Sequence, residues 1–186
     1  MTRQQPVGIG DVVIRARPGA PRQGVLRAPG IGPLRVALGR GGTGFDKREG
    51  DGRTPAGRFR PLAVLYRPDH GGRPRTRLPA RALKPDDGWC DDVADRRYNR
   101  PVRLPLGGPR AVSHERMWRD DALYDLVLVI DHNTRPRVKG RGSAVFVHLA
   151  RPGFRPTEGC VALRRADMVR LLARLAPGQG IRIRHG

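Results

Sequence analysis

Cysteine is scarce in this 186-residue sequence, which contains only Cys90 and Cys160. Two cysteines cannot build a disulfide framework or a four-cysteine zinc site, although a single bond between them is an alternative. The five histidines form no His-Glu-x-x-His pattern, and the glycine-rich residues 39–44 lack the Lys-Ser/Thr ending of a phosphate-binding loop. We therefore expect neither a zinc enzyme nor a nucleotide-binding enzyme of the P-loop type.

Long apolar runs are also absent. No segment approaches the roughly 20 apolar residues needed to cross a bilayer, so we expect no membrane span. Residues 1–21 contain no apolar segment of signal-peptide length. A chain that acts outside the cytoplasm would then need an unconventional export route or a start further upstream.

Lysine is scarce as well, so arginine carries nearly all of the net charge of +20. A charge of this size favours polyanions such as nucleic acid, anionic lipid or acidic cell-wall polymer. The arginines are spread over the whole chain, however, which favours a general compositional bias over a selected surface. Few of the aromatic residues lie in arginine-rich stretches, so we do not expect specific nucleic-acid binding.

The remaining pattern is that of a mostly β fold forming one domain, residues 1–186, with residues 1–10 loose. Apolar segments bounded by proline and glycine predict strands at residues 11–15, 24–27, 34–38, 58–66, 126–131, 144–149 and 181–184. Apolar residues at helical spacing from Met168 to Leu175 predict one amphipathic helix. Ser113 is the expected N-cap of a second, short helix, whereas residues 88–106 are expected to form a loop.

The segment Ala144–Leu163 carries the candidate chemistry. Its apolar run indicates a buried strand near whose end lies His148, and two proline- and glycine-containing corners then lead to Cys160. A histidine at a strand end and a cysteine after a short loop can meet, and a cysteine needs such a base to become a thiolate. Gly159 permits a tight turn that leaves amide groups around the sulfur. We predict Cys160 as the nucleophile, His148 as the general base, and the Gly159 and Cys160 amides as oxyanion donors.

Cys90 is the rival nucleophile. It is followed by Asp91 and Asp92, and adjacent carboxylates raise a thiol pKa and disfavour the thiolate. The carboxylate of Glu158 would also disfavour a thiolate on Cys160, but to a smaller extent. Its side chain can point away from the sulfur across the turn, and a positively charged His148 would offset its charge.

Four positions, His148, Thr157, Gly159 and Cys160, resemble the active-site signature of the L,D-transpeptidase catalytic domain, the YkuD-like family. That signature has a histidine on a strand, a loop, and a Ser/Thr-x-Gly-Cys segment. The sequence departs from it at Glu158, where histidine is frequent, and at Ala162, where arginine is common. Other segments resemble a compact, arginine-rich branch of the family: Asp51–Gly57, Gly88–Asp92, Tyr98–Val102 and Leu123–Leu126.

The resemblance implies a YkuD-like β-sandwich or barrel of mixed strands with one or two short helices. It implies a peptidoglycan L,D-transpeptidase that needs no cofactor or metal and joins stem peptides as donor and acceptor. A carbapenem should acylate its cysteine, and a backbone carbonyl should orient the second imidazole nitrogen of its histidine. The periplasm or cell wall is the expected location. The sequence does not set the oligomeric state.

The resemblance leaves more than one possible position at which the donor stem peptide is attacked. The family usually attacks after the third, diaminopimelate residue and makes 3→3 cross-links, and water as acceptor would give an L,D-carboxypeptidase. The compact chain and its segment from Trp89 to Asn99 favour 1→3 cross-links from L-alanine to diaminopimelate. The alternative from a different class is a basic nucleic-acid-binding protein.

A stem peptide carries amines and carboxylates, so its site needs charges of both signs. The polar segment after Trp89, the residues after the strand at 126–131, and the positions before Cys160 could supply them. The predicted substrate-binding residues are Asp91, Asp92, Tyr98, Asn99, His132, Thr157 and Glu158.

Overall fold

The structure is a computed structural model that describes residues 10–108 and 111–185. Of the terminal segment expected to be loose, all but Gly10 lies outside the described residues. No helix in the described part of the chain is long and apolar enough to cross a membrane.

Most strands belong to one ten-stranded mixed sheet, in the order β6-β15-β1-β2-β3-β14-β13-β12-β7-β8. Most neighbours are antiparallel, but β1 with β15, β13 with β14 and β7 with β8 are parallel. The strands are β1 (Val12–Arg17), β2 (Ala20–Ala28), β3 (Ile31–Ala37), β6 (Gly57–Phe59), β7 (Pro61–Tyr66), β8 (Ala80–Ala82), β12 (Leu126–Ile130), β13 (Phe146–Leu149), β14 (Val161–Leu163) and β15 (Ile181–Ile183). The mostly β class is therefore confirmed.

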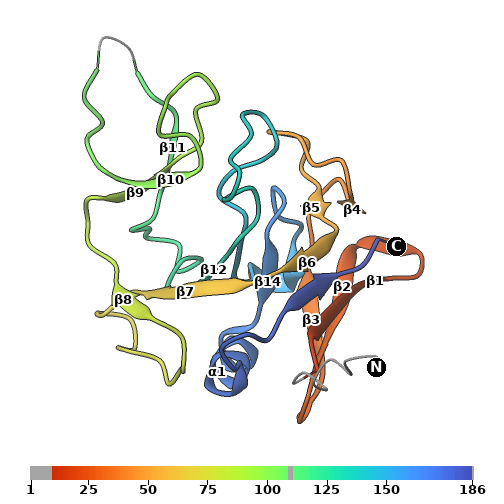
Figure 1. Ribbon diagram of the computed structural model, residues 1–186. Helices are drawn as coiled ribbons and strands as arrows, with labels where there is room; N and C mark the ends of the chain where they lie inside the picture. Colours follow the sequence, from red (N-terminus) through yellow and green to blue (C-terminus); the bar gives the residue numbers. More distant parts are fainter. Residues whose placement is uncertain (1–9, 109–110, 186) are drawn as a thin grey trace, which may run out of the picture.

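Two smaller sheets and two helices complete the fold of the described residues. The antiparallel sheet β10-β9-β11 stands to one side of the large sheet (Figure 1). The remaining elements are β4 (Thr43–Gly44), β5 (Thr54–Pro55), β9 (Asp87–Cys90), β10 (Arg100–Arg103), β11 (His114–Arg116), the 3₁₀ helix η1 (Pro152–Phe154) and the α-helix α1 (Arg165–Arg174). The amphipathic helix expected near Met168 is thus α1, and it buries Met168, Leu171 and Leu172.

The large sheet folds onto itself as a sandwich. A single residue pair, Ala37 and Ala162, joins β3 to β14. Side chains from the strands on both sides of this junction form one aliphatic core together with the apolar face of α1. Burial of this continuous aliphatic surface is the main contribution to the stability of the fold.

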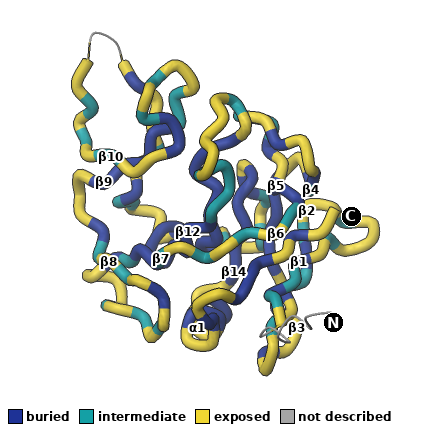
Figure 2. Tube along the Cα trace, in the orientation of Figure 1, coloured by how far each residue is buried: buried dark blue, intermediate teal, exposed yellow. Residues whose placement is uncertain are grey.

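The central strands β12 and β13 are buried along their whole length, because both of their faces are covered (Figure 2). On one face, Val145, Val147 and Leu149 belong to the aliphatic core. On the other face, Ala144 and Phe146 belong to a second core, which also contains Trp89 and Tyr124. The alternation expected along this segment is present, and it directs every second residue toward the second core.

One predicted strand is divided. Residues 58–66 were expected to be continuous, but β6 pairs with β15 and β7 pairs with β12. The break falls at Arg60, whose backbone N–H and Nε both donate to the Asp131 carboxylate (2.7 and 2.8 Å). Pro61 follows and has no N–H for a ladder, so the chain can leave the edge formed by β6 and re-enter the sheet as β7, between β12 and the opposite edge strand β8.

The segments on either side of residue 110 also differ from the prediction. Residues 88–106 form most of β9 and all of β10 instead of a loop, and Ser113 precedes the strand β11 instead of a helix. The Ser113 carbonyl accepts a hydrogen bond from the Asp91 N–H, and its N–H donates to the Asp92 carboxylate (both 3.3 Å). Pairing with β9 therefore replaces the N-cap geometry that the local sequence favours.

Candidate active site

A cavity of about 320 Å³ opens beside the second core. Cys160 and His148 line it, as do Thr157, Glu158 and Gly159 from the turn before β14. Its other walls come from the three-stranded sheet and from the loops that follow β3, β4, β11, β12 and β13. The cavity therefore lies where the small sheet faces the central strands of the large one.

The parallel pairing of β13 and β14 brings the cysteine and the histidine together. Val147 is paired with Val161 and His148 with Ala162, so Cys160 comes opposite Phe146. Phe146 and His148 lie on the same face of β13, which makes Cys160 and His148 diagonal neighbours on one face of the sheet. Both side chains therefore line the same cavity.

The sulfur of Cys160 is buried and hydrogen-bonded. The Phe146 N–H donates to Sγ, and the thiol donates to the Ala144 carbonyl oxygen (both 3.3 Å). Burial raises the pKa of the Cys160 thiol to about 12, and the Phe146 N–H opposes this rise. The resting group is therefore a neutral thiol.

His148 is held in one tautomer. Its Nδ1 lies 2.8 Å from the carbonyl oxygen of Leu149, and a carbonyl only accepts, so we assign the proton to Nδ1. The Nε2 lone pair is then available as a base. The ring packs edge-on against Tyr124, with centroids 5.3 Å apart. The backbone carbonyl that orients His148, which the sequence could not identify, is therefore that of Leu149.

Burial also sets the charge of His148. The side chain is 6% exposed, and loss of solvation lowers its pKa to about 4. At neutral pH the pair is consequently a thiol beside a neutral imidazole. The positively charged His148 that was expected to offset Glu158 is absent from this resting arrangement, because a buried imidazolium is poorly solvated.

Two threonine hydroxyls fix the turn that carries the cysteine. Thr157 and Thr54 both donate to the Cys160 carbonyl oxygen, at 2.6 and 3.3 Å. The turn is also bonded to the end of β3, because the Thr157 N–H donates to the Leu38 carbonyl (3.0 Å) and the Arg40 N–H to the Thr157 carbonyl (2.8 Å). The cysteine is therefore held by residues more than 100 positions earlier in the sequence.

Gly159 is required by the geometry of this turn. Its φ is +137°, and a Cβ there would lie 2.8 Å from the Arg53 carbonyl oxygen. Its N–H, one of the two expected oxyanion donors, instead donates to Thr157 Oγ1 (3.1 Å). The Cys160 N–H, by contrast, has no hydrogen-bond acceptor among residues 10–108 and 111–185.

Of the predicted substrate-binding residues, Asp91, Thr157 and Glu158 line the cavity. Glu158 points away from the sulfur, with its side chain 78% exposed and its carboxylate bonded to Arg40 Nε (2.7 Å). The other four, which are Asp92, Tyr98, Asn99 and His132, do not line the cavity.

Asn99 has a different position from the one expected. It is 2% exposed, and its side chain accepts from Trp89 Nε1 (2.9 Å) and donates to the Asn133 carbonyl (2.8 Å). It also accepts from the Ala144 N–H (3.2 Å). Asn99 thus ties the small sheet to the start of the segment that carries His148, and its polar atoms are engaged within the protein.

Tyr98 and His132 are similarly engaged. The Tyr98 hydroxyl donates to the Glu49 carboxylate, and Ser143 Oγ donates to the same carboxylate (2.7 Å). His132 Nε2 lies 3.0 Å from the Arg141 carbonyl oxygen, and its ring packs against Phe59. Both side chains brace the loops beside the cavity.

The two cysteines are not bonded to each other. Both are free thiols, so the alternative of a disulfide between them is wrong. Cys90 is fully buried in β9, and it does not line the cavity. Loss of solvation raises its pKa, and the charges of Asp95 and Asp91 raise it further, whereas a hydrogen bond from the Asp92 backbone opposes the rise.

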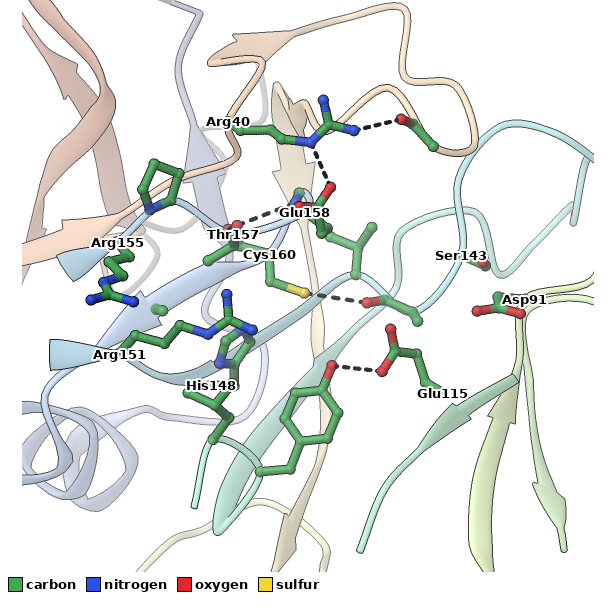
Figure 3. A pocket seen from close by; sticks show the side chains of 18 of the residues that line it. Arg40, Asp91, Glu115, Ser143, His148, Arg151, Arg155, Thr157, Glu158 and Cys160 are labelled. Atoms are coloured by element: carbon green, nitrogen blue, oxygen red, sulfur yellow. Dashed lines mark hydrogen bonds and ion pairs between the residues drawn. The ribbon is translucent and has the colours of Figure 1, made fainter. Parts of the chain in front are cut away.

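Sequence reasoning missed most of the charged residues of the cavity. Figure 3 shows Arg151 and Arg155 on one side of Cys160, Asp91, Glu115 and Ser143 on the other, and Arg40 above it, next to Glu158. One missed residue, Tyr124, lies within the segment Leu123–Leu126 that resembles the family. That resemblance could have identified it as a residue of the cavity. Among the described residues, no group of three or more His, Cys, Asp or Glu side chains is placed to hold a metal ion.

One of the comparisons with known proteins gives a match. The sequence model of the L,D-transpeptidase catalytic domain matches residues 21–183, a range that includes the whole cavity wall. No curated protein and no solved structure gives a significant match.

Proposed function

Because the chain belongs to the L,D-transpeptidase catalytic domain family, we propose that it cross-links peptidoglycan stem peptides through a thioester on Cys160. The observation that carries this proposal is the placement of a free thiol and an imidazole with an available Nε2 on one cavity wall. The family implies the reaction, and the cavity supplies a nucleophile, a base and room for a peptide.

In the first half of the reaction, Cys160 Sγ attacks a carbonyl carbon of the donor stem peptide. The thiol proton passes to His148 Nε2 as the S–C bond forms, since neither group is charged beforehand. The thiol donates to Ala144 at rest, so it must first turn toward the imidazole. Collapse of the tetrahedral intermediate breaks the C–N bond, and the imidazolium returns the proton to the departing amine.

In the second half, the ammonium of an acceptor stem peptide first loses one proton to solvent, and the neutral amine then attacks the thioester carbonyl. His148 takes a proton from the attacking nitrogen, the C–S bond breaks, and the sulfur recovers a proton from the imidazolium. Water in place of the amine would give the carboxypeptidase reaction. Leu149 holds Nδ1 through both halves, so the base keeps the same orientation.

The Cys160 N–H is the best-placed oxyanion donor in this proposal. It belongs to the residue that attacks, and it is free of internal acceptors in the described part of the chain. The Gly159 N–H would first have to leave Thr157 Oγ1. A preorganised amide at a developing negative charge contributes about 3 kcal/mol to transition-state stabilisation.

We retain 1→3 cross-linking as the specific form of the proposal, with 3→3 cross-linking as its competitor. The test is incubation of the protein with disaccharide-tetrapeptide muropeptides, followed by tandem mass spectrometry. Dimers that retain only L-alanine on the donor indicate 1→3 linkage, and loss of D-alanine alone indicates 3→3 linkage. Cys160→Ala should give no dimers, and full dimer formation by this variant would overturn the proposal.

Carbapenem acylation tests the nucleophile separately from the substrate. The intact mass should increase by one carbapenem, on a peptide that contains Cys160, and Cys160→Ala should show no increase. Acylation without cross-linking would mean that the nucleophile is right and the peptidoglycan substrate is wrong.

Nucleic-acid binding receives little support from the structure. Single-stranded nucleic acids bind on exposed aromatic rings that alternate with cationic side chains. Of the nine aromatic residues, all of which are described, only Phe45 is exposed. Arginines instead stack on rings within the protein, as Arg67 does on Trp118 (3.8 Å). A salt-titrated DNA-binding measurement would show only weak, length-independent affinity.

A further inference from the structure

Four of the charged residues that line the cavity form two pairs of opposite sign. Asp91 and Glu115 come from the three-stranded sheet, directly after β9 and within β11. Arg151 and Arg155 come from the β13–β14 connection on the opposite side of Cys160 (Figure 3). The thiol thus lies between an acidic wall, defined as Asp91 and Glu115, and a basic wall, defined as Arg151 and Arg155.

The register of the small sheet directs the acidic wall toward the cavity. Glu115 is paired with Trp89, and the Trp89 ring packs edge-on against Phe146 in the second core (5.0 Å between centroids). Asp91 follows Trp89 by two residues, which places it on the same side of the strand. Both carboxylates therefore lie on the same side of the small sheet as the Trp89 ring, whose position is fixed by its packing against Phe146.

Asp91 has a carboxylate oxygen without a partner. Its Oδ1 is inaccessible to solvent and makes no hydrogen bond in the described part of the chain. Buried polar atoms are almost always hydrogen-bonded, because loss of water without a replacement costs about 1–3 kcal/mol. An orphaned acceptor in the wall of a cavity calls for a donor supplied by a ligand.

Glu115 is only weakly partnered. The Tyr124 hydroxyl donates to it at 3.4 Å, and an Arg119 nitrogen lies 3.7 Å away. Loss of solvation raises the pKa of Glu115, and Asp91 raises it further. Glu115 in turn contributes to the raised pKa of the Cys160 thiol. Asp91 therefore disfavours the negative charge of Glu115, and Glu115 disfavours that of the sulfur, so a cation next to Glu115 would stabilise both charges.

The basic wall restricts where a cation can bind. Arg40 at the rim is engaged by Glu158, whereas the guanidinium groups of Arg151 and Arg155 form no ion pair with any described residue. They repel an ammonium and attract a carboxylate. A substrate that carries both charges is thereby oriented across the thiol.

We propose that Asp91 and Glu115 form the subsite for the primary ammonium of the acceptor stem peptide. This inference rests on the proposed function, because the acceptor amine must reach a thioester on Cys160. An ammonium has three donors, enough for Asp91 Oδ1 and for a Glu115 oxygen. The carboxylate next to that amine then faces the basic wall. Asp92, next to Asp91, lies outside the cavity and has no part in the subsite.

The test is a binding measurement that does not depend on turnover. The full chain carrying Cys160→Ala is titrated calorimetrically with a stem tripeptide that ends in diaminopimelate, with its side-chain amine either free or acetylated. We expect acetylation to weaken binding by about 10-fold or more, the size of a charge-assisted hydrogen bond. Adding Asp91→Asn should weaken binding of the free-amine peptide by a similar factor and leave the acetylated peptide unaffected.

Two further variants make the result specific. Glu115→Gln should reproduce the loss in part, and Asp92→Asn should retain the full preference for the free amine. Melting temperatures near that of the parent show that each variant is folded. Equal binding of both peptides by the parent, no binding of either, or an unchanged preference in both Asp91→Asn and Glu115→Gln would overturn the subsite.

The reaction and the subsite can fail separately. If the unmodified chain forms muropeptide dimers but the amine preference does not depend on Asp91 or Glu115, the subsite is wrong and the transpeptidase proposal stands. If the preference depends on these carboxylates but no cross-links form, the subsite is right and the proposed reaction is wrong.

Discussion

The two faces of the segment 144–149 differ in what covers them. Val145, Val147 and Leu149 pack into the aliphatic core with α1, and that face is closed. Ala144, Phe146 and His148 face the second core, where aromatic rings, a thiol and a cavity replace the aliphatic packing. Because side chains alternate along a strand, one face of this short segment packs into the aliphatic core and the other faces the second core and the cavity.

This comparison shows why the site can contain poorly satisfied groups. An Asp91 oxygen without a hydrogen-bond partner costs free energy. Burial also disfavours the charged forms of His148 and Cys160. The aliphatic face can offset that cost, because its packing is independent of the cavity. Substitutions on the two faces should therefore have different consequences.

The largest effect is expected from the cavity face. Cys160→Ala should lower cross-linking by at least about 1,000-fold, since the acyl-enzyme cannot form. Its unfolding midpoint should stay near that of the parent, because the residue lines a cavity and loses one sulfur atom. The matched control is Cys90→Ala, which removes the other buried thiol and should keep its activity per folded molecule. Loss of activity in the control alone would reverse the assignment of the nucleophile.

The second effect concerns acid stability. The pKa of folded His148 is about 4, below its unfolded value of about 6.5, so between these pH values the unfolded chain binds a proton that the folded chain does not. Stability should therefore fall as the pH falls from about 6.5 to about 4, by about 3 kcal/mol from this group, and then level off.

His148→Gln isolates this contribution, because glutamine does not titrate and its amide can still donate to a carbonyl. Urea unfolding of both proteins at pH 4.5 and pH 7.5 gives the measurement. The parent should lose more stability on acidification than the variant. Equal losses would mean that His148 is charged or solvated in the folded protein.

The third effect belongs to the closed face. Val147→Ala removes two methyl groups from a fully buried position and should cost about 2 kcal/mol of unfolding free energy. Cross-linking per folded molecule should change little, since Val147 points away from the cavity. Denaturant melts and activity at matched folded concentrations give the two readouts. A large activity loss at full folding would show that the two faces are coupled.

The smallest effect is electrostatic. Glu115→Gln removes one cause of the raised pKa of Cys160, so the thiol should titrate at lower pH. Alkylation by iodoacetamide, followed against pH, should be a few-fold faster in the variant between about pH 8 and 9. Asp92→Asn, which changes a carboxylate outside the cavity, should leave the profile unchanged. An unchanged profile in Glu115→Gln would place its charge too far from the sulfur to matter.

The local sequence was sufficient to predict that Cys160 and His148 lie close together, because both belong to one short segment. His148 lies on a strand, and a short connection leads from it to Cys160, directly before the parallel neighbouring strand. The central strands were equally predictable, since their continuous apolar runs reflect burial on both faces. The role of each side chain in catalysis stays a prediction.

Prediction was weaker where distant segments decide the outcome. Asp91 and Asn99 are close in sequence, yet the pairing of β9 and β10 directs one to the cavity and the other into the scaffold. Glu115 was hidden in a segment with a helix N-cap pattern, which pairing with β9 overrides. The carbonyl of Leu149 could not be identified because the choice depends on the rotamer of a buried ring.

The attachment of the cysteine turn has a consequence for folding. Thr54, Leu38 and Arg40 hold this turn, and all three are synthesised more than 100 residues before Cys160. A chain whose first strands are not yet docked cannot hold the sulfur in its final geometry. The environment of Cys160 therefore forms only when segments more than 100 residues apart in the sequence have come together.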